Sequence, residues 1–130
     1  MLEPDVVIET PAIAASVPLV RDLVVHTCRS LGIPSETLDD VALAVTEASA
    51  NATVHAYSGG RSGVIRVSVT VGREDVTIVV EDEGRGMGIE TIDPGAGLGL
   101  GIIGSVTANA DLGPASEGRG TSVRMAFSRA

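Results

Sequence analysis

Two neighbouring segments in the middle of the chain have a β-strand pattern. Residues 64–71, VIRVSVTV, alternate apolar and polar side chains, and residues 76–82, VTIVVED, form a second run rich in β-branched residues. The turn sequence GRED lies between them. A period of two predicts a half-buried strand, and two such strands joined by a short turn predict a β-hairpin. The apolar face of this hairpin needs a second layer to cover it.

Two predicted helices supply that layer. The first has Ser16 as a capping residue and Pro18 in its first turn, and it runs to Gly32, where glycine is typical of a helix end. The second begins with Ser35 as the expected N-cap and runs to about Tyr57, where the sequence SGGRSG breaks it.

The remaining segments complete a βααββαββ order. A short strand is expected at residues 6–9, a third helix from near Gly99 to near Asn109, and two final strands at 110–112 and 121–127. This order predicts an α/β fold of the α+β type. We expect a two-layer sandwich with a mixed, mostly antiparallel sheet and its helices on one face.

Length and composition restrict the possible functions. The 130 residues fit one domain, residues 1–130, with 44% hydrophobic residues for its core. Tyr57 and Phe127 are the only aromatic residues. A chain with so few stacking side chains and a net charge of −8 is poorly suited to nucleic acid, so direct nucleic-acid binding is not expected.

The nine basic residues are all arginines, which excludes a phosphate-binding lysine of the P-loop type. Cys28 is the only cysteine, so no internal disulfide can form. No apolar run has the ~20 residues that a membrane span requires, and the first residues are acidic where a signal peptide is basic. The expected location is therefore the cytoplasm, with no membrane partner.

Three polar residues recur along the second predicted helix. Glu47, Asn51 and His55 are spaced four residues apart, in a stretch otherwise made mainly of small or apolar residues. Such spacing places neighbours on one side of a helix. One interpretation is a solvated stripe; the other is a site against which something packs closely. His55, at the helix end, is assigned no function.

Two glycine-rich segments follow. In VVEDEGRGM, residues 79–87, a strand ends at Asp82, and Gly84 and Gly86 free the backbone beside a carboxylate that can accept from an exocyclic amine. A tight acidic turn is the alternative. In GAGLGLGIIG, residues 95–104, glycines before a helix present N–H groups that suit phosphates.

The second of these segments also contains G-x-G-x-x-G at Gly99–Gly104. A dinucleotide site requires a preceding buried strand and an acidic residue about 20 residues later at the end of a second strand. Here the preceding residues are loop-like, and Glu117 lies in a glycine-rich turn. We therefore set the dinucleotide interpretation aside.

In order, the chain carries Glu47-x3-Asn51, D-x-G-x-G from Asp82 to Gly86, G-x-G-x-G from Gly97 to Gly101, and GTSV at 120–123. This series resembles the GHKL-type ATP-binding fold of histidine kinases, gyrase-like ATPases and bacterial anti-sigma factor serine kinases. The length and close spacing look most like the anti-sigma kinases of stress-response and sporulation switches. The resemblance covers roughly residues 14–127.

The resemblance implies a role for each motif. Asn51 would hold Mg²⁺ through its amide oxygen, and Glu47 would be the general base that takes a proton from a partner's serine. Asp82 would accept from the adenine amine, with Thr121 supporting the base. The glycines Gly84 and Gly86 would let adenine approach, and residues of the later motif would wrap the triphosphate: Gly97, Leu98, Gly99, Leu100 and Gly101.

It also implies the partners: ATP and Mg²⁺, a sigma factor, an STAS-domain anti-anti-sigma protein and a second copy of the chain. Two alternatives remain, a non-catalytic ATP-dependent binding module and a detached histidine-kinase catalytic domain. The segment GIETIDPGA lacks the basic residue often found there in the family, which favours the first. The role of that basic residue would pass to Arg85 or Arg119, and less readily to Arg61. His26, among apolar neighbours, is not expected to be a phosphoacceptor.

Overall fold

The computed structural model describes residues 3–56, 63–83, 107, 109–114 and 120–129. Its elements, in chain order, are β1 (Val6–Pro11), α1 (Ser16–Ser30), α2 (Ser35–Asn51), the π-helical turn η1 (Ala52–Ala56), β2 (Val64–Val71), β3 (Asp75–Asp82), β4 (Asn109–Pro114) and β5 (Thr121–Ser128). The predicted third helix lies outside the described residues, except near its expected end, where β4 begins. In the described part of the chain, no helix is long and apolar enough to cross a membrane.

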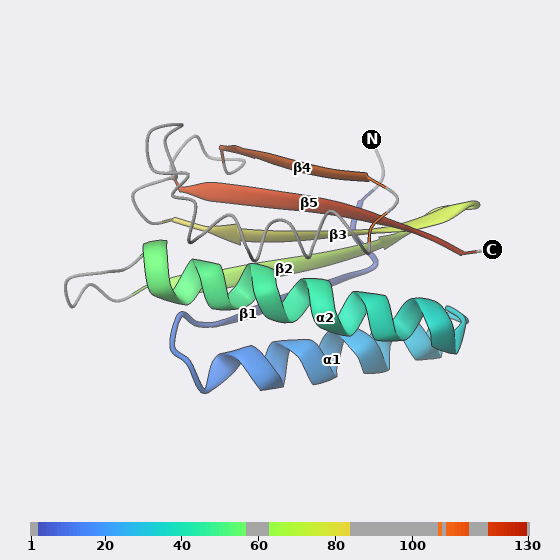
Figure 1. The fold of residues 1–130 in the computed structure, drawn as a ribbon, viewed down its shortest axis with the longest axis horizontal. Helices are drawn as coiled ribbons and strands as arrows, with labels where there is room; N and C mark the ends of the chain where they lie inside the picture. The colour runs from blue at the N-terminus through green and yellow to red at the C-terminus, as the bar shows by residue number, and fades with distance from the viewer. Residues whose placement is uncertain (1–2, 57–62, 84–106, 108, 115–119, 130) are drawn as a thin grey trace.

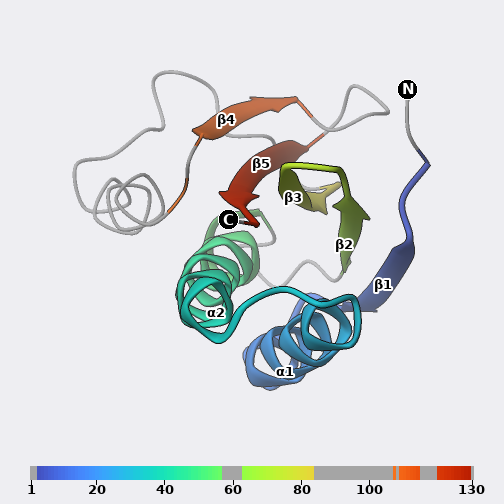
Figure 2. The same ribbon diagram turned by 90° about the vertical axis from the view of Figure 1, so that its right-hand side faces the viewer.

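The strands form one sheet in the order β1-β2-β3-β5-β4. Every neighbouring pair is antiparallel, so the described sheet contains none of the parallel pairing that a mixed sheet would allow. Both described α-helices lie against the same face of the curved sheet, and the opposite face carries neither of them (Figure 1, Figure 2). The two-layer α+β sandwich expected from the sequence is confirmed.

The core fills the space between the sheet and the helices. Side chains alternate along each strand, so β2 directs its odd-numbered residues into the core and β3 its even-numbered residues. The hairpin register pairs Val67 with Val80. From α1 the core receives Val20, Val24 and Cys28, which recur every four residues and are fully buried. Phe127, on β5, is 2% exposed and is the largest fully buried side chain. Valine, isoleucine and alanine supply most of the remainder.

The helix starts differ from the sequence expectation. Ser16 and Ser35 are the first residues of α1 and α2, and the N-cap positions are Ala15 and Pro34, neither of which makes a side-chain cap hydrogen bond. Ser16 is 4% exposed, so its position is fixed by packing. The predicted end of the first helix is correct: Gly32 has a φ of +86°, and the Ile33 N–H donates to the Cys28 carbonyl.

The second helix continues to Ala56, close to its predicted end, but its last turn is a π turn. At its start, the Thr37 hydroxyl donates to the Ser128 carbonyl over 3.3 Å, which connects α2 to the end of β5. β5 runs in the opposite direction along the helix. Each of the two elements therefore has one end at the β2–β3 turn and the other at the far end of the sheet (Figure 1).

Gly120 immediately precedes β5 and packs on the end of β3. Its φ is +81°, and a Cβ there would lie 2.6 Å from the Asp82 carbonyl carbon and 2.8 Å from the Glu83 Cα. These neighbours are backbone atoms, which cannot rotate away as a side-chain tip could. The position therefore requires glycine for its backbone conformation and for space.

We predict that Gly120→Ala lowers the free energy of unfolding by at least about 2 kcal/mol, because it adds the strain of a positive φ to a backbone clash. Urea denaturation would measure the change. Gly113→Ala is the matched control: Gly113 lies on β4, and a Cβ there meets no atom within 4 Å. Equal losses in the two variants would contradict the close packing described for Gly120.

Cys28 provides a test of core burial through pH. The side chain is fully buried, and desolvation raises the pKa of its thiol from 9.0 to about 11. The folded state therefore keeps its proton where the unfolded state has lost it, and stability falls as pH rises from about 9 towards 11.

Between pH 7 and pH 10 the wild type should lose roughly 1 kcal/mol of unfolding free energy more than Cys28→Ala, which has no thiol to titrate. Denaturation curves of both proteins at the two pH values measure this difference. A parallel loss in the two proteins would mean that the thiol titrates normally in the folded state.

Candidate functional site

Three elements converge at one end of the molecule. The end of α2, the end of β3 and the start of β5 lie together there, at the left in Figure 1. The turn η1 contacts β3, so the helix end packs directly beside the strand that carries Asp82. Residues from the first half and from the last tenth of the sequence are thereby brought to the same edge of the sheet.

Glu47 and Asn51 lie one helical turn apart on α2, and both are partly buried. Among the described residues, none forms a hydrogen bond or ion pair with the Glu47 carboxylate. The Asn51 Nδ2 atom is buried and has no hydrogen-bond partner in the described part of the chain. Since buried amides are normally satisfied, Asn51 has capacity for one more bonded group.

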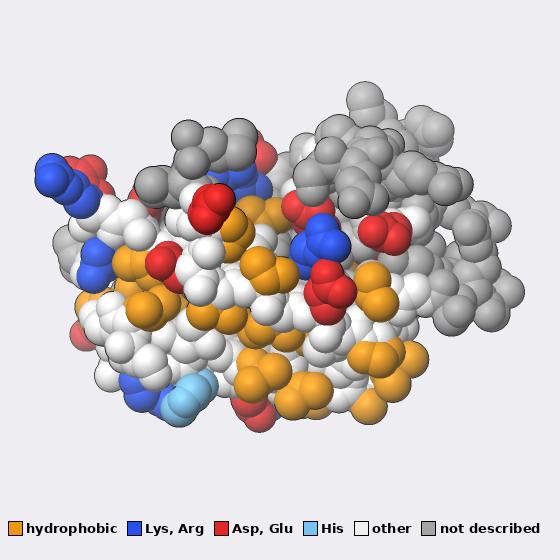
Figure 3. Space-filling model, turned by 180° about the vertical axis from the view of Figure 1, so that it is seen from behind, with side chains coloured by type: hydrophobic (Ala, Val, Ile, Leu, Met, Phe, Trp, Pro, Cys, Tyr) orange, Lys and Arg blue, Asp and Glu red, His pale blue; other side chains and the backbone are white. Residues whose placement is uncertain are grey.

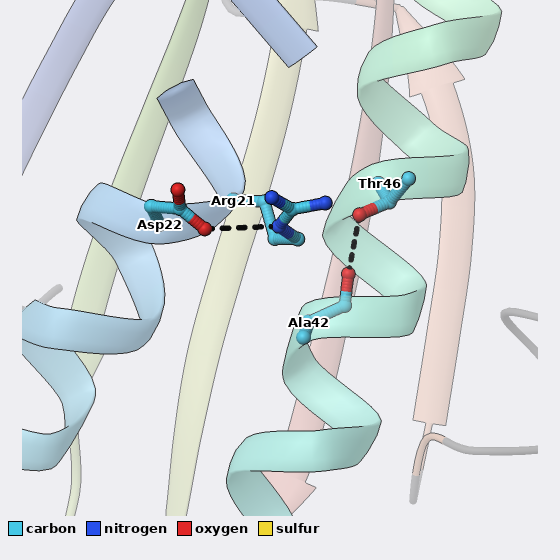
Figure 4. Close-up of polar contacts among 4 residues, drawn as sticks. All are labelled: Arg21, Asp22, Ala42 and Thr46. Carbon is cyan, nitrogen blue, oxygen red and sulfur yellow. Dashed lines mark hydrogen bonds and ion pairs between the residues drawn. The ribbon is translucent and has the colours of Figure 1, made fainter. Parts of the chain in front are cut away.

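Two neighbouring polar side chains, Thr46 and Arg21, are already engaged. The Thr46 hydroxyl donates to the Ala42 carbonyl within α2 over 2.7 Å, as Figure 4 shows. On the adjacent helix α1, Arg21 extends toward α2 but forms an ion pair with Asp22 over 3.0 Å (Figure 4). The Ser49 hydroxyl also has no hydrogen-bond partner in the described residues, but it is fully buried, whereas Glu47 is partly exposed and can reach an external group.

Asp82 is the last residue of β3 and points to the buried side of the sheet, where it is 6% exposed. The Thr121 backbone N–H donates to its Oδ1 atom over 3.2 Å, and Thr121 is also 6% exposed. This bond joins two strands that are neighbours in the sheet but 39 residues apart in sequence. It contributes to fixing the orientation of the Asp82 carboxylate.

The contribution of Gly120 was not predicted from the sequence. Its close approach to the backbone of Asp82 places the first residues of β5 within reach of the Asp82 side chain. The glycine before Thr121 in the GTSV segment was the available signal. Sequence alone, however, gives no measure of how near β3 comes to that turn.

The structure brings together the ends that carry four of the predicted site residues: Glu47, Asn51, Asp82 and Thr121. The predicted site glycines and the two leucines between them lie outside the described residues, as do the three candidate arginines: Gly84, Gly86, Gly97, Leu98, Gly99, Leu100, Gly101, Arg61, Arg85 and Arg119. His55 is in η1, and its side chain is outside what the structure describes.

The four placed residues fit Mg·ATP by their chemistry. The Asn51 amide can turn its oxygen toward a cation with little change in shape, and Mg²⁺ prefers such oxygen ligands together with phosphate and water. An ionised carboxylate acts only as a hydrogen-bond acceptor, so the buried Asp82 side chain suits the exocyclic amine of adenine, which is a donor. A partly buried carboxylate at Glu47, with no partner among the described residues, suits proton transfer.

Comparison with curated proteins identifies related regulators. The chain is 31% identical to an anti-sigma F factor of Clostridium acetobutylicum over 103 residues, which cover 69% of each protein. It is 29% identical to the serine-protein kinase RsbW of Oceanobacillus iheyensis over 84 residues, 65% of this chain and 53% of that protein. Across these two and the anti-sigma F factor of Clostridium novyi, the chain spans from 36% to 69% of the relative's length.

A solved structure shares the fold. The RsbU and RsbW domains of Rv1364c from Mycobacterium tuberculosis align with 98% of this chain and 34% of that chain, with a TM-score of 0.73 and 20% sequence identity. The family model of the histidine kinase-like ATPase domain matches residues 10–127, which include all four placed site residues. This chain therefore belongs to the histidine kinase-like ATPase domain family.

Proposed function

We propose that this protein is an ATP- and Mg²⁺-dependent anti-sigma factor that phosphorylates a serine of an STAS-domain anti-anti-sigma protein. The observation that carries the proposal is the pair on α2: the Glu47 carboxylate, which has no partner among the described residues, lies one turn from the buried, unsatisfied amide of Asn51. Similarity to anti-sigma F factors and to an RsbW kinase supports the regulatory role.

The proposal assigns different parts of Mg·ATP to different residues. Asp82, held by the Thr121 N–H, would bind the adenine amine and so place the nucleotide. Asn51 would bind the metal through its amide oxygen. When bound, Mg·ATP supplies the transferable phosphoryl group and the positive charge that shields it.

Glu47 would act on the partner protein. Its carboxylate would accept the proton of the incoming serine hydroxyl, which makes that oxygen a better nucleophile. The partly exposed neighbour Ala50, three residues after Glu47, has a small side chain that leaves room for a substrate backbone to approach. A module that only binds nucleotide has no use for a carboxylate at this position, which favours the kinase over the binding module. The proposed setting is the cytoplasm, with a sigma factor, the STAS-domain protein and a second copy of this chain as partners.

We predict that Glu47→Gln lowers transfer of γ-labelled phosphate to an STAS-domain anti-anti-sigma protein of the same organism by about 10²–10⁴-fold, because the amide cannot accept the serine proton. Nucleotide affinity, measured in the same samples, should stay within about threefold, since the change keeps the size of the side chain and removes no nucleotide contact.

Two further variants sharpen this test. Glu36→Gln, in the first turn of the same helix, is the matched control and should transfer normally. Asn51→Ala should weaken Mg·ATP binding about tenfold or more, the cost of one bond to a charged group. Tight Mg·ATP binding without transfer by the wild type would instead support the binding module, and absence of ATP binding would refute the proposal entirely.

We also predict that Asp82→Asn reduces the preference for ATP over GTP by at least about tenfold. The carboxylate accepts from the adenine amine and repels the guanine carbonyl, whereas an amide can donate as well as accept. Competition binding with the two nucleotides measures the ratio. Asp111→Asn, an exposed change on β4, is the control. An unchanged ratio in Asp82→Asn would place the base elsewhere.

A further inference from the structure

Two exposed apolar side chains flank Glu47 along the helix. Leu43 is 42% exposed, one turn before it, and Val54, in η1, is 62% exposed. A single exposed leucine or valine is ordinary on a protein surface. These two differ because they lie on either side of the candidate base.

Leu43, Glu47, Ala50 and Val54 follow one another by four, three and four residues, so each is a surface neighbour of the next. The buried residues of α2, such as Val41 and Val45, project toward the sheet on the opposite side. We call the set Leu43, Glu47, Ala50 and Val54 the α2 stripe. It is a solvent-facing apolar surface with one carboxylate inside it.

The charged residues on α2 itself are all acidic. Glu36, Asp39 and Asp40 are exposed on the preceding turns of α2, and α2 contains no basic residue. Asp39 and Asp40 lie three or four residues before Leu43, which makes them its surface neighbours. A partner that occupies the stripe must therefore be apolar where it covers Leu43 and Val54, and neutral or basic on the side toward the start of α2.

Other apolar side chains are exposed elsewhere. Hydrophobic side chains cover much of the lower part of the rear face, among scattered acidic and basic ones, as Figure 3 shows. Val7 on β1 and Leu19 and Leu23 on α1 are exposed examples on other elements. Nothing described beside them would act on a partner, whereas the α2 stripe contains the candidate base.

We propose that the α2 stripe is the docking surface for the substrate segment of a partner protein. The segment carries the phosphoacceptor serine at its centre, opposite Glu47, and apolar side chains on both sides that cover Leu43 and Val54. Its end toward the start of α2 carries basic residues, which complement Asp39 and Asp40. This inference rests on the proposed kinase function, and it defines the chemistry of the segment that the kinase recognises.

The spacing follows from helix geometry. Leu43 lies about 6 Å from Glu47 along the axis, and Val54 about 10 Å in the other direction, at 1.5 Å per residue. An extended chain advances about 3.3 Å per residue. The substrate segment should therefore have apolar residues about two positions from the serine on one side and about three on the other.

The test combines Leu43→Gln and Val54→Thr in one protein. Glutamine keeps the helix propensity of leucine, and threonine keeps the shape of valine, so the helix is preserved while the apolar surface is lost. The control combines Leu31→Gln and Val7→Thr at sites of similar exposure, 37% and 52%, away from α2. The probe is an STAS-domain anti-anti-sigma protein of the same organism, with Mg·ATP present.

We expect the stripe variant to raise the KM for the STAS-domain protein about five- to tenfold, with kcat and the KM for ATP unchanged. Direct binding of the STAS-domain protein, followed by fluorescence anisotropy with a non-hydrolysable ATP analogue, should weaken by the same factor. The control should match the wild type in both measurements. A separate Asp40→Asn variant should also weaken binding, because the proposed partner segment is basic at that end. Unchanged binding in this variant would contradict a basic segment.

The outcomes separate this inference from the proposed function. Normal ATP binding and transfer with equal partner affinity in all variants would overturn the docking surface and leave the kinase intact. Partner binding that depends on the stripe, without any transfer by the wild type, would support the surface and contradict the kinase. Equal weakening by the control variant would also overturn the surface, because the effect would then not be local to α2.

Discussion

A carboxylate at the end of an otherwise apolar strand face is the constraint on which this end of the fold depends. Alternation along β3 directs Val76, Ile78 and Val80 into the core, and the same alternation carries Asp82 inward. Burial of a charged group without a partner is costly. The Thr121 N–H is one hydrogen-bond partner of this carboxylate. To reach it, β5 must start close to the end of β3. That close approach requires glycine at position 120.

That requirement connects the site to the fold. The sheet order places β5 directly beside β3, so the bond to Asp82 continues the ladder that joins the two strands. The helix layer then places α2 across the same face, with its last turn against β3. A chain with only two aromatic residues needs close packing of small side chains for this. The alanines of α2 allow it, since Ala44 and Ala48 are buried against the core.

The hairpin and the helix layer could be predicted from the sequence because both rest on local periodicity. β2 is found with the bounds expected for it, and β3 starts one residue earlier, at Asp75. The predicted caps were wrong because Ser16 and Ser35 match a local capping preference, whereas each helix starts one residue earlier than such a cap would allow. At the first helix the burial of Ser16 accounts for this shift. The π turn has no local signal, since its sequence reads as ordinary helix.

For the site, the order of the motifs and the resemblance to the family indicated which residues to examine, and helical spacing placed Glu47 and Asn51 one turn apart. The bond between Asp82 and Thr121 could not be predicted, because it depends on which strands become neighbours across 39 residues of chain. The sequence likewise could not predict that the Asn51 amide is buried without a hydrogen-bond partner in the described residues, since burial is a property of the folded chain. The roles assigned to the glycine segments remain predictions.

The bond from Thr37 to Ser128 has a mechanical consequence. It joins α2 and β5 at the end away from the site. Glu47 lies toward the other end of α2, and Asp82 is bonded to the other end of β5. Seventeen residues of helix form a rod about 25 Å long. A tilt of about 2° around that attachment would therefore displace the far end by about 1 Å, a shift large enough to change a catalytic rate. A rigid attachment at the start of α2 thus contributes to the accurate placement of the site residues near its other end.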